Sequence, residues 1–150
     1  MTNKWDNYFK ELTDVIASKS EDIHTKVGAI IIGEGHEIRS TGYNGLPRGI
    51  QLKKSRLTRP EKYYWMVHAE VNAIANAARI GVPLLGTTLY VSMIPCPDCT
   101  RLLIQAGIKE IIILKDKVSK KGKDDYRIFD SMTKETGIKV RSLYGTDCVI

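Results

Sequence analysis

The stretch Pro95-Cys96-Pro97-Asp98-Cys99 places two cysteines three residues apart where the sequence predicts the start of a helix. Pro97 suits the first helical position, and Asp98 suits the positive end of a helix. The helical run ends at Gly107, a natural stop. Residues three apart lie on one helix face, so Cys96 and Cys99 can bind one metal ion. The free N–H groups at a helix start also favour thiolates over thiols.

A second stretch, His68-Ala69-Glu70, begins another predicted helix, which runs to about residue 79 and stops at Gly81. Side chains in the first helical turn tilt back towards the N-terminus, so His68 and the longer Glu70 can both reach a pocket before the helix. With the two cysteines, His68 completes three metal ligands and leaves Glu70 as an unused carboxylate. Structural zinc sites usually have four protein ligands, whereas catalytic sites keep one position open for water. The count of three therefore indicates a catalytic zinc site.

The composition indicates one domain, residues 1–150, of a soluble globular protein that is large enough for a proper core. Residues 1–10 hold no signal-peptide core, and no apolar run is long enough to span a membrane. Beyond the proposed zinc ligands only Cys148 remains, which excludes a disulfide framework and favours a reducing cytoplasm. The net charge of +6 suits anionic ligands, from nucleotides to nucleic acid, without choosing between them.

Apolar periodicity predicts the order α-β-β-α-β-α-β-α-β, with an antiparallel first pair followed by strand–helix crossovers. Such an order implies an α/β fold with a mixed five-stranded sheet and helices on both faces. Both zinc stretches are predicted to begin helices at neighbouring strand-to-helix junctions, where open α/β sheets bind ligands. The first helix carries an apolar stripe that is expected to pack in the core, formed by Trp5, Tyr8, Phe9, Leu12, Val15 and Ile16. The remaining predicted elements are residues 27–32, 37–42, 68–79, 87–93, 99–106, 111–114, 125–136 and 138–143.

Between the predicted strand at residues 37–42 and the predicted helix at residues 68–79 lies a loop rich in glycine, residues 43–49, followed by a strongly basic segment. The basic residues are Arg48, Lys53, Lys54, Arg56, Arg59 and Lys62. The segment is either a solvated loop or a site for an anionic group, and charge alone does not distinguish the two.

The combination of H-x-E with a later P-C-x-x-C is the signature of the zinc nucleobase deaminases. A lone C-x-x-C is more often half of a structural zinc site or a redox pair, so the specificity lies in the combination. The sequence resembles the cytidine-deaminase-like zinc hydrolases and, within them, the deoxycytidylate (dCMP) deaminases. The resemblance implies a three-layer fold and covers nearly the whole chain, through residues 18–20, 25–29, 42–49, 68–74, 95–99 and 105–110.

The resemblance also implies roles for individual residues. His68, Cys96 and Cys99 would bind Zn²⁺, and Glu70 would shuttle protons. Asn44 would hydrogen-bond the deoxyribose, and the backbone of Ala69 would bind the carbonyl of the base. The product would be dUMP, which feeds dTMP synthesis. Ligands for the second zinc ion of some relatives are lacking, since His24 and His36 are expected to be ordinary loop residues.

A monophosphate needs cationic or N–H partners, and Lys26 and Arg48 are the candidates because they lie beside the loops expected to flank the pocket. The resemblance further implies a homohexamer that is activated by dCTP and inhibited by dTTP, each with Mg²⁺. Gly42, Tyr43 and Gly45 are the candidates for the contact with these nucleotides.

Two other functions stay open. One is a deaminase of a flipped base in tRNA or single-stranded DNA. Aromatic and basic residues do not alternate near the zinc stretches, as they would in a surface that stacks neighbouring bases. No nucleic acid partner is therefore expected. The other is a zinc-stabilised binding module without catalysis, which Glu70 argues against because zinc does not need that residue as a ligand.

Overall fold

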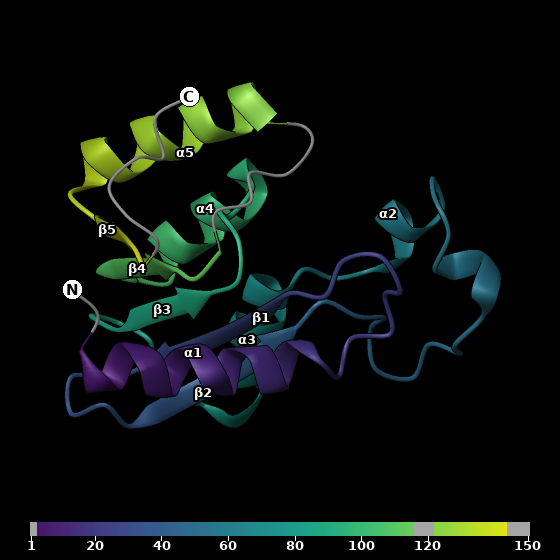
Figure 1. Ribbon diagram of the computed structural model, residues 1–150, viewed down its shortest axis with the longest axis horizontal. Helices are drawn as coiled ribbons and strands as arrows, with labels where there is room; N and C mark the ends of the chain where they lie inside the picture. Colours follow the sequence, from purple (N-terminus) through teal and green to yellow (C-terminus); the bar gives the residue numbers. More distant parts are fainter. Residues whose placement is uncertain (1–2, 116–121, 144–150) are drawn as a thin grey trace.

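The structure, a computed structural model, describes residues 3–115 and 122–143. Its sheet has five strands in the order β2-β1-β3-β4-β5 (Figure 1). Strand β1 pairs antiparallel with both β2 and β3, whereas β3, β4 and β5 run parallel. The mixed five-stranded sheet is therefore confirmed, with strands β1 (Gly28–Ile32), β2 (Ile38–Tyr43), β3 (Thr88–Val91), β4 (Glu110–Ile113) and β5 (Lys139–Ser142).

Helices cover both faces of this sheet. The alternation of side chains along β1 sends Ile30 towards α1 and Ile31 towards the opposite layer, where α3, α4 and α5 supply Ala73, Leu103 and Phe129. The three-layer architecture is thus confirmed. None of the described helices combines the length and apolarity needed to cross a membrane. The helices are α1 (Lys4–Ala17), the 3₁₀ turn η1 (Lys54–Arg56), α2 (Lys62–Trp65), α3 (Ala69–Ile80), α4 (Pro97–Gln105) and α5 (Gly122–Thr136).

The apolar stripe predicted for α1 is narrower than expected. Phe9 is fully buried against β1 and β3, but Tyr8 and Val15 are 47% and 61% exposed. The prediction that these two belong to the core was wrong, because a single helix on a sheet buries only its central stripe. Trp5, at the edge of that stripe, stacks on His36 of the β1–β2 turn, with ring centroids 4.3 Å apart.

A buried carboxylate also holds α1 to the sheet. Asp6 is fully buried and accepts hydrogen bonds from the Tyr90 hydroxyl of β3 at 2.8 Å and from the Arg141 guanidinium of β5 at 3.1 and 3.2 Å. Burial alone would raise the pKa of Asp6, but the hydrogen bonds from Arg141, Tyr90 and the Asn3 backbone outweigh it and lower this pKa. The ionised form of Asp6 is therefore part of the folded structure.

Helix α3 lies unusually close to β2 because residue 42 is glycine. A Cβ atom on Gly42 would lie 2.3 Å from the carbonyl oxygen of Ala69 and 2.4 Å from the amide nitrogen of Ala73. Such distances are shorter than any non-bonded contact allows, so only glycine fits. The close approach places the first turn of α3, which carries His68 and Glu70, directly over the sheet.

The basic segment is more ordered than a solvated loop. Together with the residues that follow it, it contains η1 and α2, neither of which the sequence predicted. In Figure 1 this basic arm, residues 48–65, extends beyond the sheet. Lys62 is buried, and its ammonium group lies 2.6 Å from the carboxylate of Asp22. Because η1 and α2 lie between β2 and α3, α3 does not begin at a strand-to-helix junction, whereas α4 directly follows β3. The expectation that both zinc stretches lie at such junctions was therefore wrong for His68.

Candidate metal centre and active site

The proposed metal ligands lie at the N-termini of two helices. His68 is the N-cap residue of α3, and Cys96 is the N-cap residue of α4, both with extended backbone. Pro97 occupies the start of α4, as predicted, and Cys99 follows within the first turn. Gly81 ends α3 in the left-handed conformation with φ of 74°, also as predicted. Both starts are thus set by local sequence signals.

The three side chains converge on one point. The Nδ1 atom of His68 lies 3.5 Å from the Sγ atom of Cys96 and 3.3 Å from that of Cys99, and all three ligand atoms lie within 4.8 Å of one another. Tetrahedral zinc with Zn–S bonds of about 2.3 Å and Zn–N bonds of about 2.0–2.1 Å separates nitrogen and sulfur ligands by about 3.6 Å. The observed spacing therefore fits a zinc ion bound through Nδ1 and two sulfurs.

The protonation of the site also fits a cation. The hydrogen bond with Cys99, and then the one with His68, lowers the pKa of the Cys96 thiol to about 4. The same contact between the sulfurs, together with burial, raises the pKa of the Cys99 thiol, and the contact with Cys96 raises the pKa of His68. The two sulfur atoms and the Nδ1 atom of His68 therefore share protons at close range. A divalent cation bound to all three atoms would displace those protons.

Glu70 lies in the first turn of α3, two residues after His68, and is 5% exposed. Burial raises the pKa of its carboxyl group, although its own backbone N–H and His68 oppose that effect. A carboxyl group with a raised pKa can both accept and donate a proton near neutrality. Its position beside three ligands without being one of them is the arrangement that the sequence predicted.

Two further predicted contact residues border this site. Ala69 is fully buried as the first residue of α3, where a backbone N–H has no partner within the helix. Asn44 directly follows β2, and its side-chain amide is held by the backbone of the loop before β1. Its Oδ1 accepts from the N–H of Val27 and its Nδ2 donates to the carbonyl of Thr25, both at 2.8 Å. These bonds use one of its two hydrogens and one of two lone pairs.

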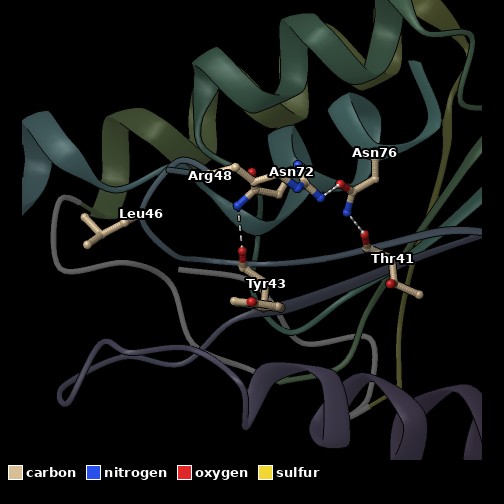
Figure 2. Close-up of a pocket in the computed structure, with 6 residues that line it drawn as sticks. All are labelled: Thr41, Tyr43, Leu46, Arg48, Asn72 and Asn76. Carbon is tan, nitrogen blue, oxygen red and sulfur yellow. Dashed lines mark hydrogen bonds between the residues drawn. The ribbon is translucent and has the colours of Figure 1, made fainter. Parts of the chain in front are cut away.

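The two candidate phosphate partners do not meet each other. The ammonium group of Lys26 is exposed and donates to the carbonyl of Ser18 at 3.2 Å. The guanidinium of Arg48 instead lies over α3, where it donates to the Oδ1 atom of Asn76 (Figure 2). No contact between Lys26 and Arg48 is present in the described part of the chain, so the structure does not bring them into one cluster.

Arg48 lines an open polar pocket of about 120 Å³ between β2, the loop after it and α3, together with Thr41, Tyr43, Leu46, Asn72 and Asn76. Asn72 and Asn76 donate to the carbonyl groups of Tyr43 and Thr41 at 2.8 and 2.7 Å (Figure 2). Tyr43 therefore lines the pocket, whereas Gly42 and Gly45 lie beside it in the backbone. Sequence reasoning missed the two asparagines, although their spacing of four on a predicted helix places them on one face.

Known proteins are similar to this chain in sequence and in fold. Residues 3–115 match the family described as the cytidine and deoxycytidylate deaminase zinc-binding region. The dCMP deaminase of cyanophage S-TIM5, whose crystal structure is a complex with dCMP and dUMP, is similar with a TM-score of 0.75 and 26% identity, covering 95% of this chain and 99% of that one.

Longer relatives are more similar in sequence. A deoxycytidylate deaminase of Pongo abelii is 39% identical over 120 residues, which cover 76% of this chain and 66% of that protein. A probable deoxycytidylate deaminase of Drosophila melanogaster is 36% identical over 148 residues, covering 91% of this chain and 71% of that protein. The chain spans about two thirds of the length of the mammalian relatives that it matches. It belongs to the cytidine and deoxycytidylate deaminase zinc-binding family.

Proposed function

We propose that the protein is a zinc-dependent hydrolase that converts dCMP and water into dUMP and ammonia. The observation that carries this proposal is the position of Glu70, which is buried beside three converging metal ligands without being one of them. A purely structural zinc site has no need of such a carboxyl group. The dCMP and dUMP bound to the cyanophage relative support the choice of substrate.

The residues divide the chemistry between binding and proton transfer. Zinc, held by His68, Cys96 and Cys99, would act as a Lewis acid and lower the pKa of a water molecule towards neutrality. Glu70 takes one proton from the attacking water and delivers it to N3 of the cytosine ring. It then takes the second proton of that water, from the hydroxyl group now on C4, and donates it to the amine, which leaves C4 as ammonia. Its raised pKa suits both directions of transfer. The burial of Glu70 also keeps bulk water from competing for that proton.

Recognition of the substrate relies on groups that border the metal centre. The N–H of Ala69 binds the carbonyl of the base, and the remaining hydrogen and lone pair of Asn44 bind the deoxyribose. Lys26 and Arg48 remain the candidates for the phosphate, each of them a cationic donor that could turn towards it. A comparison of dCMP with deoxycytidine tests this part, because equal kcat/KM values would contradict a site that reads the phosphate.

Regulation by nucleotides is the finer part of the proposal. We infer that the protein is a homohexamer, activated by dCTP and inhibited by dTTP, each with Mg²⁺. The pocket that contains Tyr43 and Arg48 supports a nucleotide site there. Its volume of about 120 Å³ is below the roughly 300–1,000 Å³ of most ligand pockets, so a neighbouring subunit would have to complete it.

The alternative is a deaminase of bases in single-stranded nucleic acid. The basic arm favours it more than the sequence suggested, because Arg56 stacks on Trp65 with 4.1 Å to the ring centroid and Tyr64 is 82% exposed. Aromatic and basic side chains together form the stacking surfaces of single-strand binders. Incubation with dCMP, deoxycytidine, cytidine and a cytosine oligonucleotide separates the two functions, and preference for the oligonucleotide would overturn the proposal.

A further inference from the structure

A buried ion pair joins the basic arm to the loop in front of β1. The ammonium group of Lys62 lies 2.6 Å from Oδ2 of Asp22, and both side chains are less than a tenth exposed, at 7% and 4%. The other oxygen, Oδ1, accepts the backbone N–H groups of His24 and Thr25 at 2.8 and 3.1 Å. The single carboxylate of Asp22 therefore fixes both the arm and the course of residues 22–25.

That loop in turn fixes Asn44. The carbonyl of Thr25 accepts from Nδ2 of Asn44, and the N–H of Val27 donates to its Oδ1. A carbonyl can only accept and an N–H can only donate, so these two contacts set which way the amide faces. Ser20 also donates to the backbone carbonyl of Asn44 at 2.6 Å. The orientation of the Asn44 amide thus depends on the loop that Asp22 holds.

The same contacts form a closed ring that returns to the metal centre. The N–H of Met66 donates to the carbonyl of Lys62 at 2.9 Å. The next residue, Val67, exchanges two backbone hydrogen bonds with Gly45, at 3.1 and 2.8 Å. Val67 precedes the zinc ligand His68, and Gly45 follows Asn44. The ring thus runs from Lys62 through Asp22, the loop, Asn44 and Gly45 back to the arm.

We propose that Asp22 and Lys62 are positioning residues for the substrate, because their ion pair closes the ring of contacts that orients Asn44 beside His68. Neither residue touches the metal ligands through any contact in the described part of the chain, so they act through Asn44. A buried charged pair suits this role because replacing one partner leaves the other charge buried and unpaired. The inference rests on the proposed function for its choice of substrate.

The test is the variant Lys62→Met measured in three ways. The KM for dCMP rises about tenfold, the equivalent of one lost hydrogen bond to the substrate, whereas kcat and zinc content stay close to those of the wild type. In the Asn44→Ala background the same substitution raises KM no further, because residues that act through one another are not additive. Lys134→Met, which removes an exposed ion pair on α5, is the control and leaves KM unchanged.

Hydrogen exchange supplies a readout that does not depend on turnover. Lys62→Met accelerates exchange of the amides of His24, Thr25 and Val27 and leaves those within β1 protected. If Lys62→Met yields no folded protein, Asp22→Asn replaces it, since an amide still accepts from the two backbone N–H groups. An unchanged KM with unchanged exchange, or KM effects that add in the double variant, overturns the inference. Absence of dCMP turnover in the wild type would instead refute the proposed function, and exchange and dCMP binding would then decide the inference.

Discussion

The Nδ1 atom of His68 lies 3.3 Å from the Sγ atom of Cys99, although 31 residues separate them in the chain. Each side chain belongs to the first turn or cap of a helix, and both helices pack on the same face of the sheet. The site is therefore held by rigid elements, and its geometry depends on the packing of α3 and α4 on the sheet. Sites built on helices and strands hold their groups more accurately than sites on loops.

Removal of one thiol is expected to abolish metal binding. Cys99→Ala leaves two ligands, so the protein loses most of its zinc and part of its stability, because metal binding is coupled to folding. Elemental analysis of the purified variant and thermal unfolding measure both effects. Cys148→Ala, at a position outside the described residues, is the control and should keep one zinc ion per chain. Stoichiometric zinc in Cys99→Ala would rule out the assignment of this ligand.

Substitution of the carboxyl group separates the catalyst from the ligands. Glu70→Gln retains zinc and fold, because the amide has nearly the same shape, but it loses proton transfer. Turnover of dCMP is expected to fall by about 10²–10⁴-fold or more, the usual contribution of a general acid–base group. Glu11→Gln, an exposed change on α1, serves as the control. Activity of Glu70→Gln near that of the wild type would remove Glu70 from the mechanism.

Asp6 gives the stability of the protein a predictable dependence on pH. Its pKa is lower in the folded than in the unfolded state, so the ionised form adds stability above the unfolded value of about 3.9. That contribution is lost as the pH falls through the folded pKa. Asp6→Asn should lower the free energy of unfolding at pH 7 by about 1.5–3 kcal/mol, the worth of hydrogen bonds to a charged group.

Urea titrations between pH 7 and pH 2 measure this difference. The gap between Asp6→Asn and the wild type should begin to narrow below about pH 3.9, where Asp6 of the unfolded chain binds a proton. It should close as the pH falls further through the lower folded pKa, where Asp6 of the folded wild type is protonated as well. Asp130→Asn, which disrupts an exposed pair with Lys134, is the control, and it should change the free energy of unfolding by about 1 kcal/mol at most. A gap that stays constant across this range would contradict an ionised Asp6 in the fold.

Regulation is tested by titrating dCTP and dTTP with Mg²⁺ against dCMP turnover while the mass in solution is measured. Activation by dCTP and inhibition by dTTP of a hexamer are expected, with coupling of about 1–3 kcal/mol, or 5–150-fold in affinity. Arg48→Ala should weaken both effects, whereas Arg79→Ala, an exposed change on the same side of the sheet in α3, should not. Hyperbolic kinetics from a monomer that ignores both nucleotides would refute regulation and leave the zinc chemistry intact.

The parts of the fold that follow local rules could be predicted from the sequence. Local signals mark the helix starts at His68 and Cys96, the stops at Gly81 and Gly107, and the apolar strands. The positions of the metal ligands and of the strands could therefore be predicted. The arm could not be predicted in this way. Lys62 appears as one more basic residue in a charged segment, and its burial depends on Asp22, 40 residues earlier in the chain.

The same limit applies around the site. Arg48 is a reasonable phosphate partner by sequence, but its place over α3 depends on Asn76, which no motif singled out. Tyr8 and Val15 fit the helical period, yet both are exposed, because a single helix on a sheet buries only its central stripe. Charged side chains and helix edges acquire their surroundings from tertiary contacts, and a one-dimensional pattern does not contain those contacts.

The most direct test of the central claim is the reaction of the zinc-loaded protein with dCMP, followed by the loss of cytosine absorbance and by separate assays of both products. Equal amounts of dUMP and ammonia are predicted, with loss of activity when zinc is removed by a chelator and recovery when zinc is restored. Absence of dUMP from fully zinc-loaded, folded protein would contradict the account.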